Sequence, residues 1–215
     1  MTIRVLLADD QEIIRTGLTI ILDDQPGIEV VGRAANGIEA VEMARRLRPD
    51  VCLLDIRMPG LDGVEATRRL AGPEVGNPTA VVVITTFDTD ENVYAALEAG
   101  ARGFLLKDAG PELLTQAVRA AAAGDALIDP GVTARLLSVF ARRTPTADEP
   151  PEPLTEREEE ILLLVARGRT NAELAGELFI SLSTVKFHLA RIMTKLGARN
   201  RVEIAMWAYR TGRIG

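Results

Sequence analysis

Five short apolar runs, separated by segments of helical length, constrain the fold of the first 125 residues more than any other feature of this 215-residue chain. Near-continuous apolar runs are typical of strands buried on both faces of a parallel sheet. The predicted strands are Ile3–Ala8, Glu29–Ala34, Val51–Leu54, Ala80–Ile84 and Gly103–Leu106. Apolar residues at helical spacing predict helices over Glu12–Leu22, Gly37–Leu47, Val64–Leu70, Glu91–Ala99 and Pro111–Ala123. The pattern predicts a doubly wound α/β domain with a five-stranded parallel sheet.

Polar residues follow four of these strands at their carboxyl ends. Asp9 and Asp10 follow the first strand, Asp55 the third, Thr85 the fourth and Lys107 the fifth. Ligands of open α/β sheets bind at this edge, so we expect the side chains to converge and to leave one oxygen of Asp55 open to modification. Adjacent carboxylates raise each other's pKa or recruit a cation, and hard oxygen ligands favour Mg²⁺ or Mn²⁺. A carboxylate beside such a cation, a lysine and a hydroxyl can accept a phosphoryl group.

Four segments of the front half resemble the receiver domain of two-component response regulators, a flavodoxin-like fold. They read LLADDQ at 6–11, LLDIRMPGLDG at 53–63, VITTFD at 83–88 and GFLLKD at 103–108. The resemblance implies that Asp55 is the phosphoacceptor. It also implies that Asp9, Asp10, Asp55 and the backbone carbonyl of Arg57 hold a divalent cation.

The same resemblance assigns the phosphate contacts and a switch. Thr85 and Lys107 match the residues that contact the phosphoryl group, and Phe104 matches the aromatic residue that swings inward when the hydroxyl moves. Thr86 adjoins Thr85, but the 22-residue spacing to Lys107 favours Thr85. Asp108 stands where many receivers have proline, which leaves the isomer of that peptide bond open.

A proline-rich segment, Thr144–Pro153, separates the front half from a second unit. Its four prolines and three acidic residues predict a stiff, solvated linker, preceded by a short helix over Val132–Arg143. We therefore place the receiver domain at 1–125, the helix and linker at 126–153 and a second domain at 154–215. The whole chain has a net charge of −6, yet Ser181–Arg213 holds seven basic residues and one acidic residue, which favours a nucleic-acid surface.

The sequence of the second domain predicts helices and no strands. Thr155 and Glu158 form a capping box before the first helix, which ends at Gly168, and further helices are expected at 171–178, 182–196 and 199–211. A short helix, a tight turn and a longer basic helix are typical of the helix-turn-helix motif. An ordinary solvated helix face also carries Lys and Arg, but it explains an exposed Phe187 poorly.

This domain resembles the LuxR-type helix-turn-helix of the NarL/FixJ response regulators. The matching segments are LTEREEEIL at 154–162 and GRTNAELAGELFISLSTVKFHLARIMTKLGARNR at 168–201. The resemblance implies that the third helix enters the major groove of double-stranded DNA, and Ala190 stands where some members have lysine. The exposed face and the resemblance together name as DNA contacts Thr170, Asn171, Ser183, Thr184, Lys186, Phe187, Arg191, Lys195 and Arg199.

The last helix is apolar on two sides, whereas a terminal helix needs one side to cover a core. We assign the side formed by Ile204, Trp207 and Ala208 to self-association. A homodimer would suit the two-fold symmetry of many DNA sites.

Together these features predict a transcription factor rather than an enzyme. A sensor histidine kinase would transfer a phosphoryl group to Asp55, and the paired domains of a homodimer would bind a repeated operator. One alternative is a phosphatase of the haloacid dehalogenase class, although Arg57 occupies the place of its second acid. The other is a DNA-binding regulator that never uses phosphate and keeps a vestigial acidic site.

Single residues exclude several other classes. One cysteine, Cys52, excludes a disulfide framework and a multi-Cys zinc site, and one histidine, His188, excludes multi-His metal sites. The beginning of the chain lacks a secretory pattern, and no apolar run reaches the roughly 18 residues of a membrane span. We therefore expect a cytoplasmic protein with no membrane partner.

Overall fold

The structure is a computed structural model that describes residues 2–86, 89–128, 132, 150, 152–198 and 200–214. These residues belong to two compact units that divide between residues 133 and 134. The predicted helix over Val132–Arg143 lies outside the described residues except for Val132, as does most of the predicted linker. Among the helices that the structure describes, none combines the length and the apolar character needed to cross a bilayer.

The first unit is built on a parallel sheet with the strand order β2-β1-β3-β4-β5-β6. Its strands are β1 (Ile3–Ala8), β2 (Ile28–Ala34), β3 (Val51–Leu54), β4 (Ala80–Thr85), β5 (Gly103–Leu106) and β6 (Leu127–Ile128). The predicted doubly wound sheet is therefore confirmed, with one strand more than expected. The additional strand, β6, pairs two residues with Gly103 and Phe104, and a run this short shows no sequence alternation.

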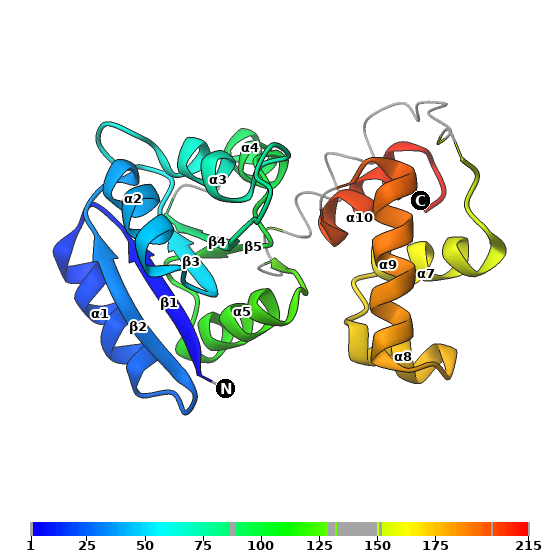
Figure 1. The fold of residues 1–215 in the computed structure, drawn as a ribbon, viewed down its shortest axis with the longest axis horizontal. Coiled ribbons are helices and arrows are strands. Elements are labelled where there is room, and N and C mark those ends of the chain that lie inside the picture. The colour runs from blue at the N-terminus through cyan, green and yellow to red at the C-terminus, as the bar shows by residue number, and fades with distance from the viewer. Residues whose placement is uncertain are drawn as a thin grey trace. The chain divides into compact units, whose positions relative to one another are not determined.

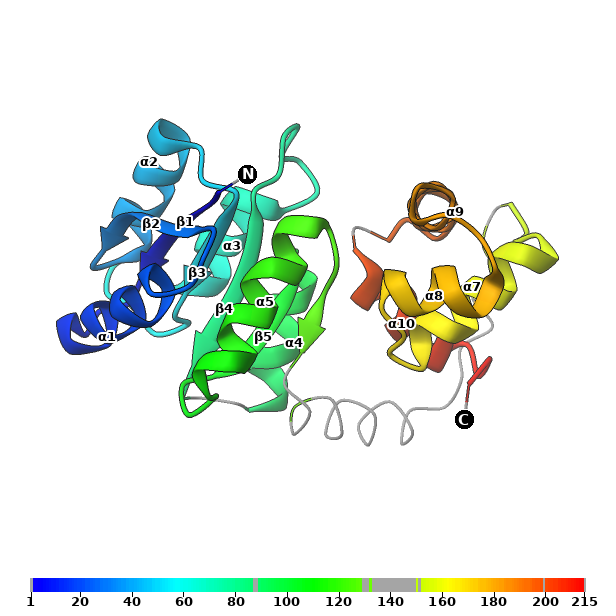
Figure 2. The same cartoon turned by 90° about the horizontal axis from the view of Figure 1, so that it is seen from below.

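Helices cover both faces of this sheet, which explains the apolar strands. They are α1 (Glu12–Asp23), α2 (Gly37–Leu47), α3 (Gly63–Ala71), α4 (Asp90–Glu98) and α5 (Pro111–Ala123). α1 and α5 lie on one face, and α2, α3 and α4 lie on the other (Figures 1 and 2). Every residue of the central strands β3 and β4 is buried as a result.

The strand register brings the carboxyl ends of the strands to one level. Ala8 pairs with Leu54 at the ends of β1 and β3, and the amide of Asp55 donates to the carbonyl of Ala8 at 2.8 Å. Thr85 pairs with Leu106 at the ends of β4 and β5. The residues that follow these strands therefore meet at one edge of the sheet.

The second unit contains the four predicted helices. They are α7 (Glu156–Ala166), α8 (Asn171–Leu178), α9 (Leu182–Leu196) and α10 (Arg201–Arg210). The capping box of Thr155 and Glu158 is present at the start of α7. α8 and α9 are joined through Phe179, which adopts a left-handed conformation with φ of 54°, so the two helices form a helix-turn-helix.

The assignment of Ile204, Trp207 and Ala208 to self-association is wrong. These side chains are 0%, 6% and 0% exposed and belong to the core of the second unit, because α10 packs against both α7 and α9. A helix that contacts two neighbours needs two apolar sides for its own fold. The second side therefore requires no partner chain to explain it.

Candidate acidic site and nucleic-acid interface

Three carboxylates meet at the carboxyl edge of the sheet. Asp9, Asp10 and Asp55 each offer an oxygen that lies within 4.8 Å of the others. Asp9 and Asp55 are 1% and 3% exposed, whereas Asp10 is exposed. The predicted convergence of these residues from β1 and β3 is confirmed.

Lys107 provides the counter-charge of this cluster. Its Nζ lies 2.5 Å from Oδ2 of Asp9 and 2.8 Å from Oδ2 of Asp55. Burial alone would lower the pKa of Lys107, but its hydrogen bonds to the two aspartates raise it. The lysine that follows β5 therefore remains a cation and holds two of the three carboxylates together.

The two buried aspartates keep acceptor capacity that the described residues do not use. Burial raises the pKa of Asp9, although Lys107 and the backbone amide of Gln11 act in the opposite direction. Oδ1 of Asp55 is buried and has no hydrogen-bond partner among the described residues. One oxygen of Asp55 thus has no partner among the described residues, but it is buried, so the expectation that it lies open to modification is not met in this structure.

The oxygen-only donor set fits a divalent cation. Three carboxylates exceed the single charge of Lys107, and Mg²⁺ takes oxygen ligands of this kind. The residues at this edge of the sheet therefore fit the metal that their chemistry suggests.

The loop between β3 and α3 is packed tightly against Asp55. A Cβ added to Gly63 would lie 1.9 Å from the backbone oxygen of Asp55, and the amide of Gly63 donates to the carbonyl of Ile56 at 2.8 Å. α3 then begins with Asp62 as its N-cap, which accepts from the amide of Glu65. Glycine at this position therefore fixes how the β3–α3 loop wraps around the site.

The remaining predicted residues of the acidic site lie on β4, on β5 and in the β3–α3 loop. Thr85 is buried as the last residue of β4, whereas Thr86 is exposed. Phe104 is fully buried in β5, and Arg57 is exposed two residues after Asp55. The peptide bond between Lys107 and Asp108 is trans.

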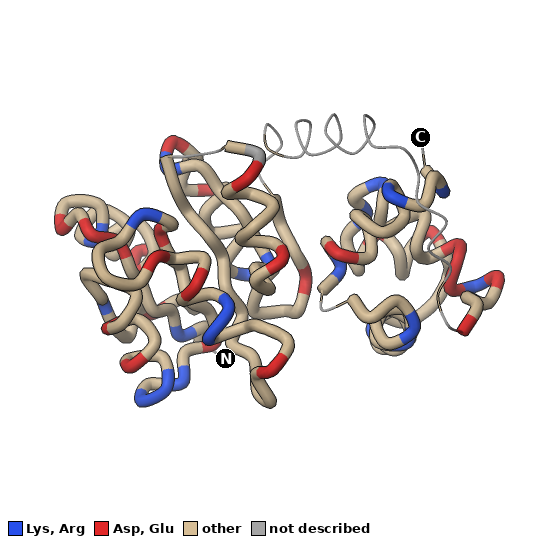
Figure 3. Tube along the Cα trace, turned by 90° about the horizontal axis from the view of Figure 1, so that it is seen from above, with Lys and Arg blue, Asp and Glu red and all other residues tan. Residues whose placement is uncertain are grey.

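The exposed face of α9 presents the residues of the candidate nucleic-acid interface. The sequence of this helix contains three basic residues and no acidic residue, and Figure 3 accordingly shows blue and no red on it. Phe187 is 56% exposed, and the side chain of Arg191 is 49% exposed. At the start of the helix, the hydroxyl groups of Ser183 and Thr184 lie 2.7 and 2.8 Å from that of Ser181, the N-cap.

Of two neighbouring residues that were predicted to lie near phosphates, one is exposed and the other is buried. Thr170 is exposed and caps α8 in a box with Glu173. Asn171 is 3% exposed and accepts from Nη1 of Arg201 at 3.2 Å, so its side chain is not available to DNA and that assignment is wrong. Arg199 lies outside the described residues.

The assignment of Lys195 to a phosphate contact is also wrong. Its side chain is 5% exposed, and its Nζ lies 2.8 Å from Oε2 of Glu158 and 2.9 Å from Oε1 of Glu152. The same Nζ donates to the carbonyl of Pro153 at 3.0 Å. Lys195 therefore serves the fold of this unit, and its cation is already compensated.

Glu158 is the residue of this surface that sequence reasoning missed. The capping box identified Glu158 only as a signal for the start of a helix. In the structure its Oε1 also lies 3.3 Å from Nε of Arg191 on α9. Burial raises the pKa of Glu158, but hydrogen bonds from Lys195 and Thr155 outweigh this effect and hold the pKa at about 2. The capping box already accounted for a glutamate at this position, so the sequence pattern did not indicate that it also pairs with residues of α9.

Comparisons with known proteins match a protein family to each of the two units. The model of the response regulator receiver domain family matches residues 5–119, and that of the luxR family of bacterial regulatory proteins matches residues 152–208. The transcriptional regulatory protein LiaR of Bacillus subtilis (strain 168) is 43% identical over 208 residues, and the alignment covers 97% of each chain. The response regulator protein VraR of Staphylococcus aureus is 38% identical over 211 residues, with 97% of each chain covered.

Solved structures of response regulators are also similar to this chain. The response regulator ChrA of a heme-sensing two-component system is similar over 99% of each chain, with 39% identity and a TM-score of 0.54. The response regulator RcsB in complex with DNA is similar over 97% of this chain and 98% of its own, with 25% identity and a TM-score of 0.59.

Proposed function

This chain belongs to the two-component response regulators that join a receiver domain to a LuxR-family DNA-binding domain, and we propose that a sensor histidine kinase switches it by phosphorylating Asp55. It is a DNA-binding transcription regulator.

The observation that carries the proposal is the arrangement of the two oxygens of Asp55. Oδ2 is bound by Lys107 at 2.8 Å, whereas the buried Oδ1 has no partner among the described residues. An acceptor left unpaired in a buried site costs free energy, so a site that retains one is expected to use it. We assign Oδ1 as the atom that receives the phosphoryl group.

The transfer joins Oδ1 of Asp55 to the phosphorus and breaks the bond between phosphorus and the donor's histidine nitrogen. Phosphoryl transfer depends on in-line positioning and on neutralising the charge of the equatorial oxygens. A Mg²⁺ or Mn²⁺ ion held by Asp9, Asp10, Asp55 and the carbonyl of Arg57 would supply part of that neutralisation. Lys107 would exchange one carboxylate contact for a phosphoryl oxygen.

The switch would begin with Thr85. A hydroxyl at the end of β4 can donate to the new phosphoryl group, and Phe104 on the neighbouring β5 would occupy the space that this movement affects. Support comes from the burial of both side chains and from the pairing of β4 with β5 through Thr85 and Leu106. Such a movement biases a two-state equilibrium that leads to a homodimer on DNA.

DNA would be read by α9 with its N-terminus and its exposed face in the major groove. Support comes from the exposed Phe187 and Lys186 and from the absence of acidic residues along α9. Phosphate contacts give salt-dependent affinity, and contacts with base edges give the choice of site. A homodimer would place two such helices on a repeated operator.

A small acyl phosphate tests the switch without the kinase. With Mg²⁺, the full-length protein is expected to gain the mass of one phosphoryl group, and Asp55→Asn is expected to gain none. Asp62→Asn is the matched control, because asparagine still caps α3 and the residue lies outside the carboxylate cluster. A wild-type protein that gains no mass would favour a regulator that never uses phosphate.

A salt titration of DNA binding tests the second unit independently. We expect Lys186→Ala to lose affinity for the operator and for unrelated DNA and to reduce the slope of log affinity against log salt by about 1. Full retention of affinity and of the salt slope by this variant would count against a contact of Lys186 with DNA.

A further inference from the structure

A buried carboxylate supports the exposed face of α9 from a neighbouring helix. The side chain of Glu158, on α7, is 2% exposed. Its Oε2 accepts from Nζ of Lys195 at 2.8 Å and from the amide of Thr155 at 2.9 Å, which leaves Oε1 facing Arg191. One acidic residue in the first turn of α7 therefore contacts α9 through both of its carboxylate oxygens.

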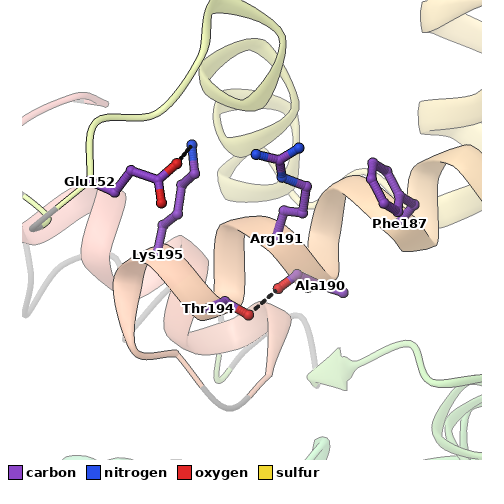
Figure 4. A pocket seen from close by; sticks show the side chains of 6 residues that line it. All are labelled: Glu152, Phe187, Ala190, Arg191, Thr194 and Lys195. Carbon is purple, nitrogen blue, oxygen red and sulfur yellow. Dashed lines mark hydrogen bonds and ion pairs between the residues drawn. The ribbon is translucent and has the colours of Figure 1, made fainter.

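Arg191 is held on two sides. Its Nε lies 3.3 Å from Oε1 of Glu158, and its guanidinium carbon lies 5.9 Å from the centre of the Phe187 ring. Phe187, Arg191 and Lys195 project from the same side of α9 (Figure 4). Among the described residues the guanidinium has no other ion pair, so the edge formed by its two terminal nitrogens is not engaged by another carboxylate.

The charges around Arg191 cancel. The pocket beside α9 is lined by Phe187, Ala190, Arg191, Thr194, Lys195 and Glu152. With Glu158 beneath it, this surface holds two cations and two carboxylates, which are joined by ion pairs. Sequence-independent binding to DNA arises from uncompensated positive charge, so this cluster contributes little to it.

A compensated, oriented and half-exposed guanidinium is suited to a contact in which geometry matters more than charge. Guanine presents O6 and N7 as two adjacent acceptors in the major groove, and the planar fork of arginine matches them. Phe187, four residues earlier on the same side, offers an apolar surface that phosphates do not favour. The surroundings of Arg191 thus favour a base edge over the phosphate backbone.

We infer that Arg191 reads a guanine in the major groove and that Glu158 is a positioning residue that holds the guanidinium in its reading orientation. The inference rests on the proposed DNA-binding role of α9 and adds a specificity-determining pair to it. Glu158 acts through Arg191 and does not itself touch DNA.

The test uses the full-length protein phosphorylated by a small acyl phosphate. The wild type first selects a preferred site from a random double-stranded DNA library, and fluorescence anisotropy then measures affinity for that site and for its single-base variants. Arg191→Ala is expected to lose the preference for guanine at one position by about tenfold or more, with an unchanged salt slope. Arg191→Lys is expected to lose the same preference, because lysine keeps the charge but not the fork.

Glu158→Gln tests the positioning role. We expect it to weaken discrimination at the same base pair and to cause no further loss of discrimination in the Arg191→Ala background. A merely structural role would lower affinity for all sequences alike, and by the same factor in both backgrounds. Glu158→Asp, which keeps the charge but shortens the side chain, provides the same comparison if the glutamine variant does not fold.

The matched control is Glu160→Gln, which breaks the exposed ion pair of Glu160 with Arg157 on the same helix and is expected to leave base preference unchanged. An unchanged base preference in Arg191→Ala overturns the inference, as does a reduced salt slope, which would place Arg191 on a phosphate. A wild type that enriches no sequence refutes site-specific DNA binding itself, and this result distinguishes failure of the proposed function from failure of the Arg191 assignment.

Discussion

The ammonium of Lys107 lies 2.8 Å from Oδ2 of Asp55, a contact between residues 52 positions apart in the chain. The same ammonium lies 2.5 Å from Asp9, and all three side chains are almost completely buried. Lysine is therefore the internal counter-ion of a site that contains more carboxylates than cations.

Replacing Lys107 with methionine is expected to destabilise the receiver domain. Removing one partner of a buried ion pair leaves uncompensated charge, so the free energy of unfolding should fall by about 3–5 kcal/mol. Mg²⁺ should restore part of the loss, because a cation that binds only the folded cluster stabilises it. Hydrogen exchange of the β-strands with and without Mg²⁺ measures both effects.

Arg69→Met is the control for this prediction. It removes an ion pair with Glu65 in which both side chains are more than one-third exposed, so the expected change is within about 0.5 kcal/mol and independent of Mg²⁺. A Lys107→Met protein as stable as the wild type would contradict the role of Lys107 as the counter-ion.

Gly63→Ala is expected to disturb the site by displacing the backbone next to Asp55. The added Cβ would lie 1.9 Å from the carbonyl oxygen of Asp55, so the β3–α3 loop must shift. We expect a loss of about 1–3 kcal/mol in stability and slow or absent phosphorylation by a small acyl phosphate. Intact mass against time measures the rate, and thermal unfolding measures the stability.

Gly17→Ala is the matched substitution within the same domain. Gly17 lies inside α1, and outside its chain neighbours and the backbone of its own helix no described atom lies within 4 Å of an added Cβ, so alanine should stabilise the helix by about 0.5–1 kcal/mol and leave phosphorylation unchanged. If both alanine variants accept phosphate at the wild-type rate, the packing of Gly63 has no role in the chemistry.

The sheet and its acidic edge could be predicted from the sequence because parallel strands end at a common level. Asp9, Asp55 and Lys107 each follow directly after an apolar run, and the register of β1, β3 and β5 turns that order into proximity. The apolar runs marked these strands clearly, since the central strands β3 and β4 are buried along their whole length.

Helix faces were harder to predict because burial depends on what packs against them. Lys195 lies four residues after Arg191 on the same side of α9, yet its Nζ is paired with Glu158, 37 residues away in the sequence. Asn171 is buried beside Arg201 for a similar reason. α10 has two apolar sides because it contacts both α7 and α9. Such long-range contacts leave no periodic signal.

Thr85→Ala is expected to retain phosphorylation but to lose most of the effect of phosphorylation on DNA affinity. The variant should still accept one phosphoryl group on Asp55, but the gain in DNA affinity upon phosphorylation should fall by about tenfold or more, because the hydroxyl that responds to the new charge is absent. Thr86→Ala is the control, since Thr86 is exposed in the next position. Equal responses of the two variants would contradict the assignment of Thr85.

The stability of the DNA-binding domain is expected to depend on pH through Glu158. Its pKa is held at about 2 in the folded protein, below its ordinary value of 4.5. A carboxyl group with a lowered folded pKa stabilises the fold above its unfolded pKa and loses that contribution as the pH falls through the folded value. The midpoint of urea unfolding should therefore decrease between about pH 4.5 and pH 2.

Trp207 makes this measurement specific to one unit, because it is the single tryptophan of the chain and is buried in the core of the second unit. Glu158→Gln should be less stable than the wild type at neutral pH by about 1–3 kcal/mol, since charged hydrogen bonds are lost. The difference should shrink as the pH approaches 2, where the wild-type carboxyl also becomes neutral. Glu160→Gln, whose ion pair is exposed, should follow the wild-type curve. Parallel curves for Glu158→Gln and the wild type across this range would show that the stability of this domain does not depend on the ionised carboxylate.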